Sequence, residues 1–210
     1  MTIYAILKLA LYILAFVFFL ASVGVLSWGI ITKKTSRIIG AVVLFFLAPA
    51  CILVSFMVAV KQYSFDVNEC PTFEVTSKDI NNGFWDVKIS HDKGSDLSPE
   101  LTWEPVEGAT SYTVYMFDTS AGNWIHMKTS TDKTSLASGE VSEYIGPYPP
   151  SGVHDYVIYV FALKETKGLP EVLDAPSDGA KELASMLNTF SNSDVGNIVA
   201  IGRLEASYPG

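Results

Sequence analysis

Two long apolar runs without a charged residue open the chain. Residues 9–32 and 38–60 contain no Asp, Glu, Lys or Arg. A helix rises about 1.5 Å per residue, so roughly 20 apolar residues cross a hydrocarbon layer about 30 Å thick. We therefore predict two transmembrane helices over about 9–32 and 38–60, which form a hairpin within residues 1–61. A buried core helix is the alternative for either run, and a cleaved signal peptide is the alternative for the first.

Alternating apolar and polar positions dominate the remainder of the chain. Strand patterns cover residues 84–90, 111–117, 123–128, 154–163 and 197–204. The run 154–163 is the longest and most apolar, which predicts a central strand. Residues 180–187 repeat apolar side chains at helical spacing, with Asp178 as the expected N-cap. The pattern predicts a mainly β domain over residues 73–210, with one late helix crossover.

Charge divides the chain at residue 61. Residues 1–61 hold five Lys and Arg and no acid, whereas residues 62–210 hold nine basic residues and all 22 acidic ones, a net charge of −13. Such an acidic domain is a poor binder of nucleic acid, because phosphate contacts need Lys and Arg.

The loop between the two apolar runs carries three positive charges, from Lys33, Lys34 and Arg37. Positive loops next to membrane helices favour the cytoplasmic side. We therefore predict a two-pass integral membrane protein whose soluble domain lies on the extracytoplasmic side. Residues 62–72 are predicted to form a short polar linker to that domain.

Motifs of nucleotide-binding and metal-binding enzymes are missing from the sequence. It contains no P-loop, no GxSxG, no HExxH and no CxxC pair, and we predict neither a metal nor a cofactor. Trp124 and His126 share one face of a predicted strand, Asp118 ends another, and His154 begins a third. Spacing alone leaves two interpretations open: one pocket at adjacent strand ends, or unrelated residues at separate strand ends.

Short motifs in a fixed order along the domain resemble those of one known family. The chain reads FEVTSKDI at 73–80, LSPELTW at 97–103, GATSY at 108–112, MFD at 116–118, WIH at 124–126, GPYPPSGVHDY at 146–156 and VAIGRL at 199–204, with Tyr208 after it. The phosphatidylethanolamine-binding protein family, which includes Raf kinase inhibitor protein and many bacterial relatives, carries similar patterns such as W-x-H and G-P-x-P-P-x-G-x-H-x-Y. The resemblance implies an antiparallel β-sandwich of that family, here preceded by two transmembrane helices.

The resemblance also implies a small pocket for anions and phosphorylated head groups. In the family, the histidine after the P-P-x-G turn lines this pocket, and the W-x-H strand and a D-P-D turn form its other wall. The matching positions are Asp118, Trp124, His126, Pro149, Pro150, His154 and Tyr156. An imidazole has an unperturbed pKa of about 6.5, so a neighbouring carboxylate can hold it protonated. Two imidazolium groups and N–H groups of the turns can then bind a phosphate.

The chain departs from the family pattern at two places. The D-P-D-A-P signature reads Asp-Thr-Ser-Ala-Gly at 118–122, so Ser120 replaces the second aspartate and both prolines are absent. The H-R-Y motif reads His-Asp-Tyr at 154–156, and Asp155 is expected on the alternate face of its strand, in solvent. Both changes bear on ligand specificity.

From these observations we predict a membrane-tethered, non-catalytic binding module for a phosphorylated head group or small anion. A protein-interaction regulator that inhibits a kinase or protease, as some relatives do, is the second hypothesis, since a charge of −13 suits a basic partner. A weak hydrolase is the third, with His126 or His154 as general base and Ser120 as the suspected nucleophile.

Overall fold

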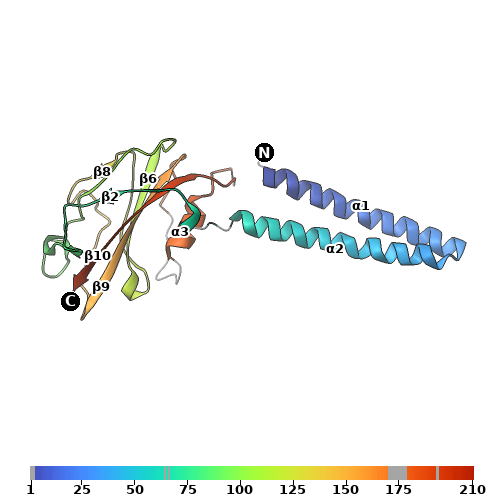
Figure 1. Cartoon of the computed structure of the whole chain (residues 1–210), viewed down its shortest axis with the longest axis horizontal. Helices are drawn as coiled ribbons and strands as arrows, with labels where there is room; N and C mark the ends of the chain where they lie inside the picture. Colours follow the sequence, from blue (N-terminus) through green and yellow to red (C-terminus); the bar gives the residue numbers. More distant parts are fainter. Residues whose placement is uncertain (1–2, 64, 66, 170–178, 193) are drawn as a thin grey trace. The chain divides into compact units, whose positions relative to one another are not determined.

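The computed structural model describes residues 3–63, 65, 67–169, 179–192 and 194–210. The chain divides into two compact units, Met1–Ser64 and Phe65–Gly210 (Figure 1). The first unit is helical and the second is mainly β, so each is considered by itself.

Two long helices make up the first unit. α1 spans Ile3–Thr32 and α2 spans Thr35–Tyr63, and the two lie side by side (Figure 1). Within them, Leu9–Thr32 and Thr35–Met57 are long and apolar enough to cross a membrane. The prediction of two long apolar helices ahead of the β domain is thus confirmed, with the second helix starting at Thr35 rather than at residue 38.

The turn between the helices is short and is held by a hydrogen bond and a cation–π contact. Lys33 takes the left-handed conformation, at φ 49°, and the Lys34 N–H donates to the Gly29 carbonyl at 3.1 Å. The Arg37 guanidinium stacks over the Trp28 ring, 3.7 Å from its centroid. A Cβ at Gly29 would lie within 3.1–3.2 Å of Arg37 and Ile38, so glycine here lets α2 approach α1.

Small side chains form the contact between the two helices. In the described part of the hairpin, the buried residues are Ala15, Ser22, Gly29, Ala41, Ala48 and Ser55. Within each helix they recur every seven residues, which keeps them on one stripe. The large apolar side chains point outward. This arrangement is typical of helices that pack in lipid, where small residues let two backbones come close.

A seven-stranded sheet forms the centre of the second unit. In spatial order its path is β3 (Ile80–Asn81), β4 (Phe84–Trp85), β10 (Ile198–Pro209), β9 (Val153–Leu163), β6 (Ser111–Asp118) and β7 (Trp124–Thr131), and β1 (Thr72–Phe73) pairs with β10 off this path. The four long strands are antiparallel neighbours, and the short β1 and β4 pair with β10 in parallel. The apolar run predicted to be a central strand is β9, between β10 and β6.

Both faces of this sheet are covered. A second, three-stranded sheet consists of β2 (Val75–Thr76), β5 (Leu101–Trp103) and β8 (Ser135–Leu136). One buried cluster includes Trp103 of β5 with Met116 and Ile158 of the large sheet. A second cluster includes Leu183 and Leu187 of α3 (Gly179–Leu187), which follows β9 and precedes β10. The predicted mainly β fold with a late helix is therefore confirmed; Asp178, the expected cap of α3, lies outside the described residues.

One predicted strand is largely wrong. Of residues 84–90, only Phe84 and Trp85 form a strand, and a 3-10 helix, η2, covers Val87–Ile89. The Asp86 carboxylate accepts a hydrogen bond from the Lys88 N–H at 2.8 Å, which caps the helical turn. Alternation of side chains over a few residues does not reveal such a cap.

The segment predicted as a polar linker, residues 62–72, contains ordered structure. Val67–Glu69 forms the 3-10 helix η1, and Phe65, Val67 and Cys70 pack against the second buried cluster. The Ile201 N–H donates to the Pro71 carbonyl at 2.9 Å, just before β1 joins the sheet. Most of this segment thus packs as part of the β unit.

Candidate functional site

A cavity of about 270 Å³ lies where β6 ends and where β7 and β9 begin. Its lining comprises Asp118, Ala121, Trp124, His126, Tyr148, Pro149, Pro150, His154 and Tyr156. The antiparallel register explains the assembly, because Asp118 pairs with Trp124 on one side and with Tyr156 on the other. The structure thus brings all seven predicted site residues to one cavity.

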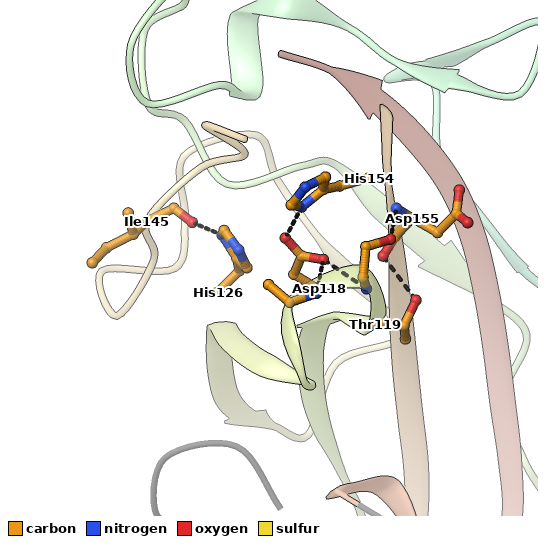
Figure 2. Close-up of polar contacts among 8 residues, drawn as sticks. Asp118, Thr119, His126, Ile145, His154 and Asp155 are labelled. Carbon is orange, nitrogen blue, oxygen red and sulfur yellow. Dashed lines mark hydrogen bonds and ion pairs between the residues drawn. The ribbon is translucent and has the colours of Figure 1, made fainter. Parts of the chain in front are cut away.

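The buried Asp118 and the half-buried His154 form a pair at this cavity. One Asp118 oxygen accepts hydrogen bonds from the N–H groups of Ser120 and Ala121, both at 2.9 Å. The other oxygen accepts from His154 Nδ1–H at 2.7 Å (Figure 2). A carboxylate only accepts, so Nδ1 carries the proton and Nε2 remains for a ligand. The turn N–H groups of Ser120 and Ala121, in contrast, are already used.

His126 is held in a different way. Its side chain is buried, and Nδ1–H donates to the Ile145 carbonyl at 2.6 Å (Figure 2). Burial lowers the pKa of His126, against the opposing effects of the Ile145 carbonyl and the Asp118 carboxylate. His126 is therefore neutral at pH 7, and the sequence-based picture of two imidazolium groups does not hold for this ring at that pH.

Aromatic rings form the walls of the cavity. The Trp124 ring stands perpendicular to the rings of His126 and Tyr148, with centroids 4.3 and 5.8 Å away. Tyr156 lies edge-on to His126 at 5.0 Å. These walls make the cavity apolar around its few polar atoms, which is typical of small-ligand sites.

Tyr148 and Ala121 are the two lining residues that the sequence analysis missed. Tyr148 is 44% exposed and also contacts the ring of His91 at 5.4 Å, so it stands at the mouth of the cavity. Its position between Pro147 and Pro149 was the available signal. Ala121 gave none, since a methyl side chain carries no recognisable chemistry.

The turn that carries Tyr148 is fixed from outside the cavity. Asp96 accepts hydrogen bonds from the Gly146 N–H at 2.7 Å and from His91 Nδ1–H at 2.8 Å. Partial burial works against ionisation of Asp96, but these two bonds outweigh it and lower its pKa. A Cβ at Gly146 would collide with the Ile89 carbonyl, so only glycine fits there. His91 itself is exposed.

Tyr156 supplies a hydrogen-bond donor without a partner. Its side chain is fully buried, and its hydroxyl makes no hydrogen bond of normal geometry to any residue that the structure describes. Burial raises its pKa well above the usual value, and the charge and weak hydrogen bonding of the nearby Asp118 carboxylate add to this, so the phenol keeps its proton. A buried donor of this kind favours a ligand with an acceptor atom.

The described lining of the cavity contains no Ser, Thr or Cys. Ser120 is exposed, its hydroxyl accepts a hydrogen bond from the Asp155 N–H at 3.0 Å, and it does not line the cavity. The described residues also contain no group of three or more His, Cys, Asp or Glu that could hold a metal. Ser120, the suspected nucleophile of the hydrolase hypothesis, therefore lies outside the cavity.

Comparison with known proteins agrees with the fold. The family model described as phosphatidylethanolamine-binding protein matches residues 75–200. CT736 of Chlamydia trachomatis, a homologue of phosphatidylethanolamine-binding protein, gives a TM-score of 0.50 at 20% identity, over 66% of this chain and 98% of its own. YbcL of E. coli, described as a new member of the mammalian family, gives 0.50 at 25% identity over the same shares. No curated protein sequence matches.

Proposed function

The chain belongs to the phosphatidylethanolamine-binding protein family, and we propose that it is a membrane-tethered module that binds a small anion or a phosphorylated head group. The family fold supports a binding module as such. The observation that carries the finer proposal is the cavity that combines two imidazoles of fixed tautomer with the unpartnered hydroxyl of Tyr156.

The cavity provides several hydrogen-bonding groups for an anion. The Tyr156 hydroxyl donates one hydrogen bond, and His154 Nε2, which the bond of Nδ1 to Asp118 leaves available, provides a second contact. Neutral His126 has a hydrogen-bond acceptor at Nε2. This nitrogen accepts a hydrogen bond from a monoprotonated phosphate, or it takes up a proton when the anion binds. Because no Lys or Arg lines the cavity, the positive charge comes from the imidazoles alone. Anion binding is therefore linked to proton uptake.

The two apolar helices support the membrane tether. Their span length, their outward-facing large side chains and the positive loop at Lys33, Lys34 and Arg37 fit a hairpin with that loop on the cytoplasmic side. The β unit would then lie on the extracytoplasmic side. Protease added to sealed right-side-out vesicles should remove the β unit, and full protection of it would refute this orientation.

The binding test uses the full chain in detergent with ¹⁵N-labelled histidine, because only three imidazoles need to be assigned. Sulfate is the first probe, since it stays a dianion between pH 5 and 8, and phosphate and glycerophosphoethanolamine follow. We expect the His126 and His154 signals to shift together while His91 stays still, and the affinity for sulfate to rise as pH falls. Absence of any shift in all three titrations would refute the anion site.

The Tyr156→Phe variant tests the donor itself. It removes one hydroxyl and keeps the ring, so we expect about tenfold weaker sulfate binding. Stronger binding of glycerophosphoethanolamine than of phosphate would identify a head group as the ligand, whereas the reverse order would identify a free anion.

The charge of the β unit supports a second candidate, regulation through a basic protein partner. The segment 62–210 carries a net charge of −13. Affinity capture from solubilised membranes, with a chain that lacks the β unit as control, tests this role. A partner retained equally by the control would count against it.

A further inference from the structure

The turn that carries Asp118 is attached to β9 by side chains. β6 and β9 pair up to Asp118 and Tyr156, after which the chain leaves the sheet in the 3-10 helix η3, Thr119–Ala121. Asp155 is therefore the first residue of this pairing without a backbone partner on β6. The hydroxyl groups of Thr119 and Ser120 take that place.

Both backbone groups of Asp155 are engaged by this turn. The Thr119 hydroxyl donates to the Asp155 carbonyl at 3.0 Å, and the Asp155 N–H donates to the Ser120 hydroxyl at 3.0 Å (Figure 2). The Asp155 carboxylate in turn accepts from the Ser207 hydroxyl of β10 at 2.6 Å, and Asp155 does not line the cavity. We call Thr119, Ser120, Asp155 and Ser207 the Asp155 clamp.

The clamp attaches the turn to β9, in addition to the cap that Asp118 provides. η3 is a single turn, and Gly122 and Asn123 follow it with positive φ, at 65° and 62°. Glycine adopts this conformation freely and asparagine tolerates it better than most residues, so the local backbone permits the turn. The prolines that stand at 119 and 122 in the motif that the sequence resembles would restrict the backbone there, and this chain lacks them.

We propose that Thr119 and Ser120 are positioning residues: through the Asp155 clamp they hold the η3 turn so that the Asp118 carboxylate stays on Nδ1 of His154. The link is short, since Asp118 is the N-cap of η3 and one of its oxygens binds the N–H groups of Ser120 and Ala121. A shift of the turn would move the carboxylate from the imidazole. Hydroxyl bonds to β9 thus replace the rigidity of the prolines, and Ser120 faces the strand instead of adding a second carboxylate to the cavity.

This inference rests on the proposed function only for its effect on ligand affinity, so its test has a readout without ligand. In the full chain with ¹⁵N-labelled histidine, the His154 Nδ1 signal and the hydrogen exchange of its proton report the bond to Asp118. Thr119→Val and Ser120→Ala each remove one hydroxyl of the clamp. We expect at least about fivefold faster exchange of that proton and about fivefold weaker phosphate binding in each variant.

The chain offers a matched control at the far end of the same strand pair. The Thr110 hydroxyl donates to the Lys164 carbonyl at 2.8 Å, just before β6 begins and after β9 ends. Thr110→Val removes the same kind of bond far from the cavity. We expect it to leave the His154 signal and phosphate binding unchanged, and Thr119→Ser and Ser120→Thr, which keep the hydroxyls, to retain wild-type values.

Three outcomes test the positioning role. If Thr119→Val and Ser120→Ala leave the His154 Nδ1 proton unchanged, or if Thr110→Val alters it equally, the positioning role is refuted. If either clamp variant fails to fold, Ser207→Ala, which removes a half-buried hydroxyl at the edge of the clamp, must still speed the exchange. If the wild-type chain does not bind phosphate while the clamp variants change the exchange rate of the His154 Nδ1 proton, the proposed function is refuted and the positioning role is supported.

Discussion

Large apolar side chains point outward in the helical hairpin and inward in the β unit. In the hairpin, Phe46 and Phe56 are each 66% exposed, and the buried residues of the helices are Ala, Ser and Gly. In the β unit, Phe117 and Phe161 are buried almost completely. The same residue type is thus outside in one unit and inside in the other.

The difference shows which force holds each unit together. Water drives large apolar groups into a core, with about 25 cal/mol for each Å² removed from it. In a membrane, which we propose for the hairpin, lipid would remove that drive between helices, so close packing of small residues would decide their contact. The β unit is stabilised by what it buries, and the hairpin by how closely its backbones approach.

The strongest test of this contrast replaces the same residue type in both units. Phe161→Ala empties a fully buried site in the second cluster, and we expect a loss of about 3–5 kcal/mol in the free energy of unfolding of the β unit. Phe46→Ala, at an outward position of α2, should leave that free energy unchanged. Chemical denaturation of the full chain in detergent, followed by tryptophan fluorescence, measures both. Equal losses would refute the separation into two units.

A second test adds volume to the hairpin contact. Ala41 is 2% exposed, so Ala41→Leu should force the helices apart, at a cost of about 1–3 kcal/mol. Val43→Leu, at an outward position that does not line the groove between the labels, is the control. Pyrene labels at Val23 and Phe46, which line one groove, report the contact through excimer fluorescence in a background without Cys51 and Cys70. An unchanged excimer signal in Ala41→Leu would contradict the proposed packing.

The sequence predicted the parts of the fold that rest on long patterns. Three patterns are long enough to identify their secondary structure from the spacing of apolar side chains. They are the apolar runs of the hairpin, the central strand at 154–163 and the helix at 180–187. The run 84–90 was too short, and a single side chain, Asp86, redirected its backbone through a local cap. Residues 62–72 read as a linker because Phe65 and Val67 stand alone among polar residues, and only the folded sheet provides their partners.

The residues of the candidate site were predictable to the extent that their chemistry is recognisable. Imidazoles, a carboxylate and prolines in ordered motifs led to seven of the nine lining residues. The state of His126 was not predictable, because its pKa depends on burial and on the Ile145 carbonyl, nineteen residues away. The clamp on Asp155 was hidden for the same reason, since it joins residues that only the strand register brings together.

The boundary between the two units can be tested at Phe65. This side chain packs against the second cluster directly after α2, so Phe65→Ala should destabilise the β unit by about 1–2 kcal/mol. Phe84→Ala, at a position 45% exposed in the same unit, should have a smaller effect. Both are measured by the denaturation assay used for Phe161. No effect of Phe65→Ala would place the start of the β unit further along the chain.

The smallest expected effect is a pH dependence of stability that is present in the β unit and absent from the hairpin. All three histidines lie in the β unit, and burial lowers the pKa of His126 in the folded state. Between that lowered pKa and the unfolded value of about 6.5, the unfolded chain binds more protons. The contribution of His126 to stability is therefore present above about pH 6.5 and is lost as pH falls toward the folded pKa, by at most about 1.4 kcal/mol per pH unit.

Denaturation of the β unit at several pH values between 5 and 7.5 measures this slope. His126→Asn keeps a donor for the Ile145 carbonyl and removes the titration, so it should flatten the curve, whereas His91→Gln at an exposed position should not. Asp96, whose pKa is lowered, loses its contribution only below about pH 4, outside this range. The excimer signal of the hairpin should stay constant throughout. A slope that persists in His126→Asn would show that another group of the β unit senses the pH.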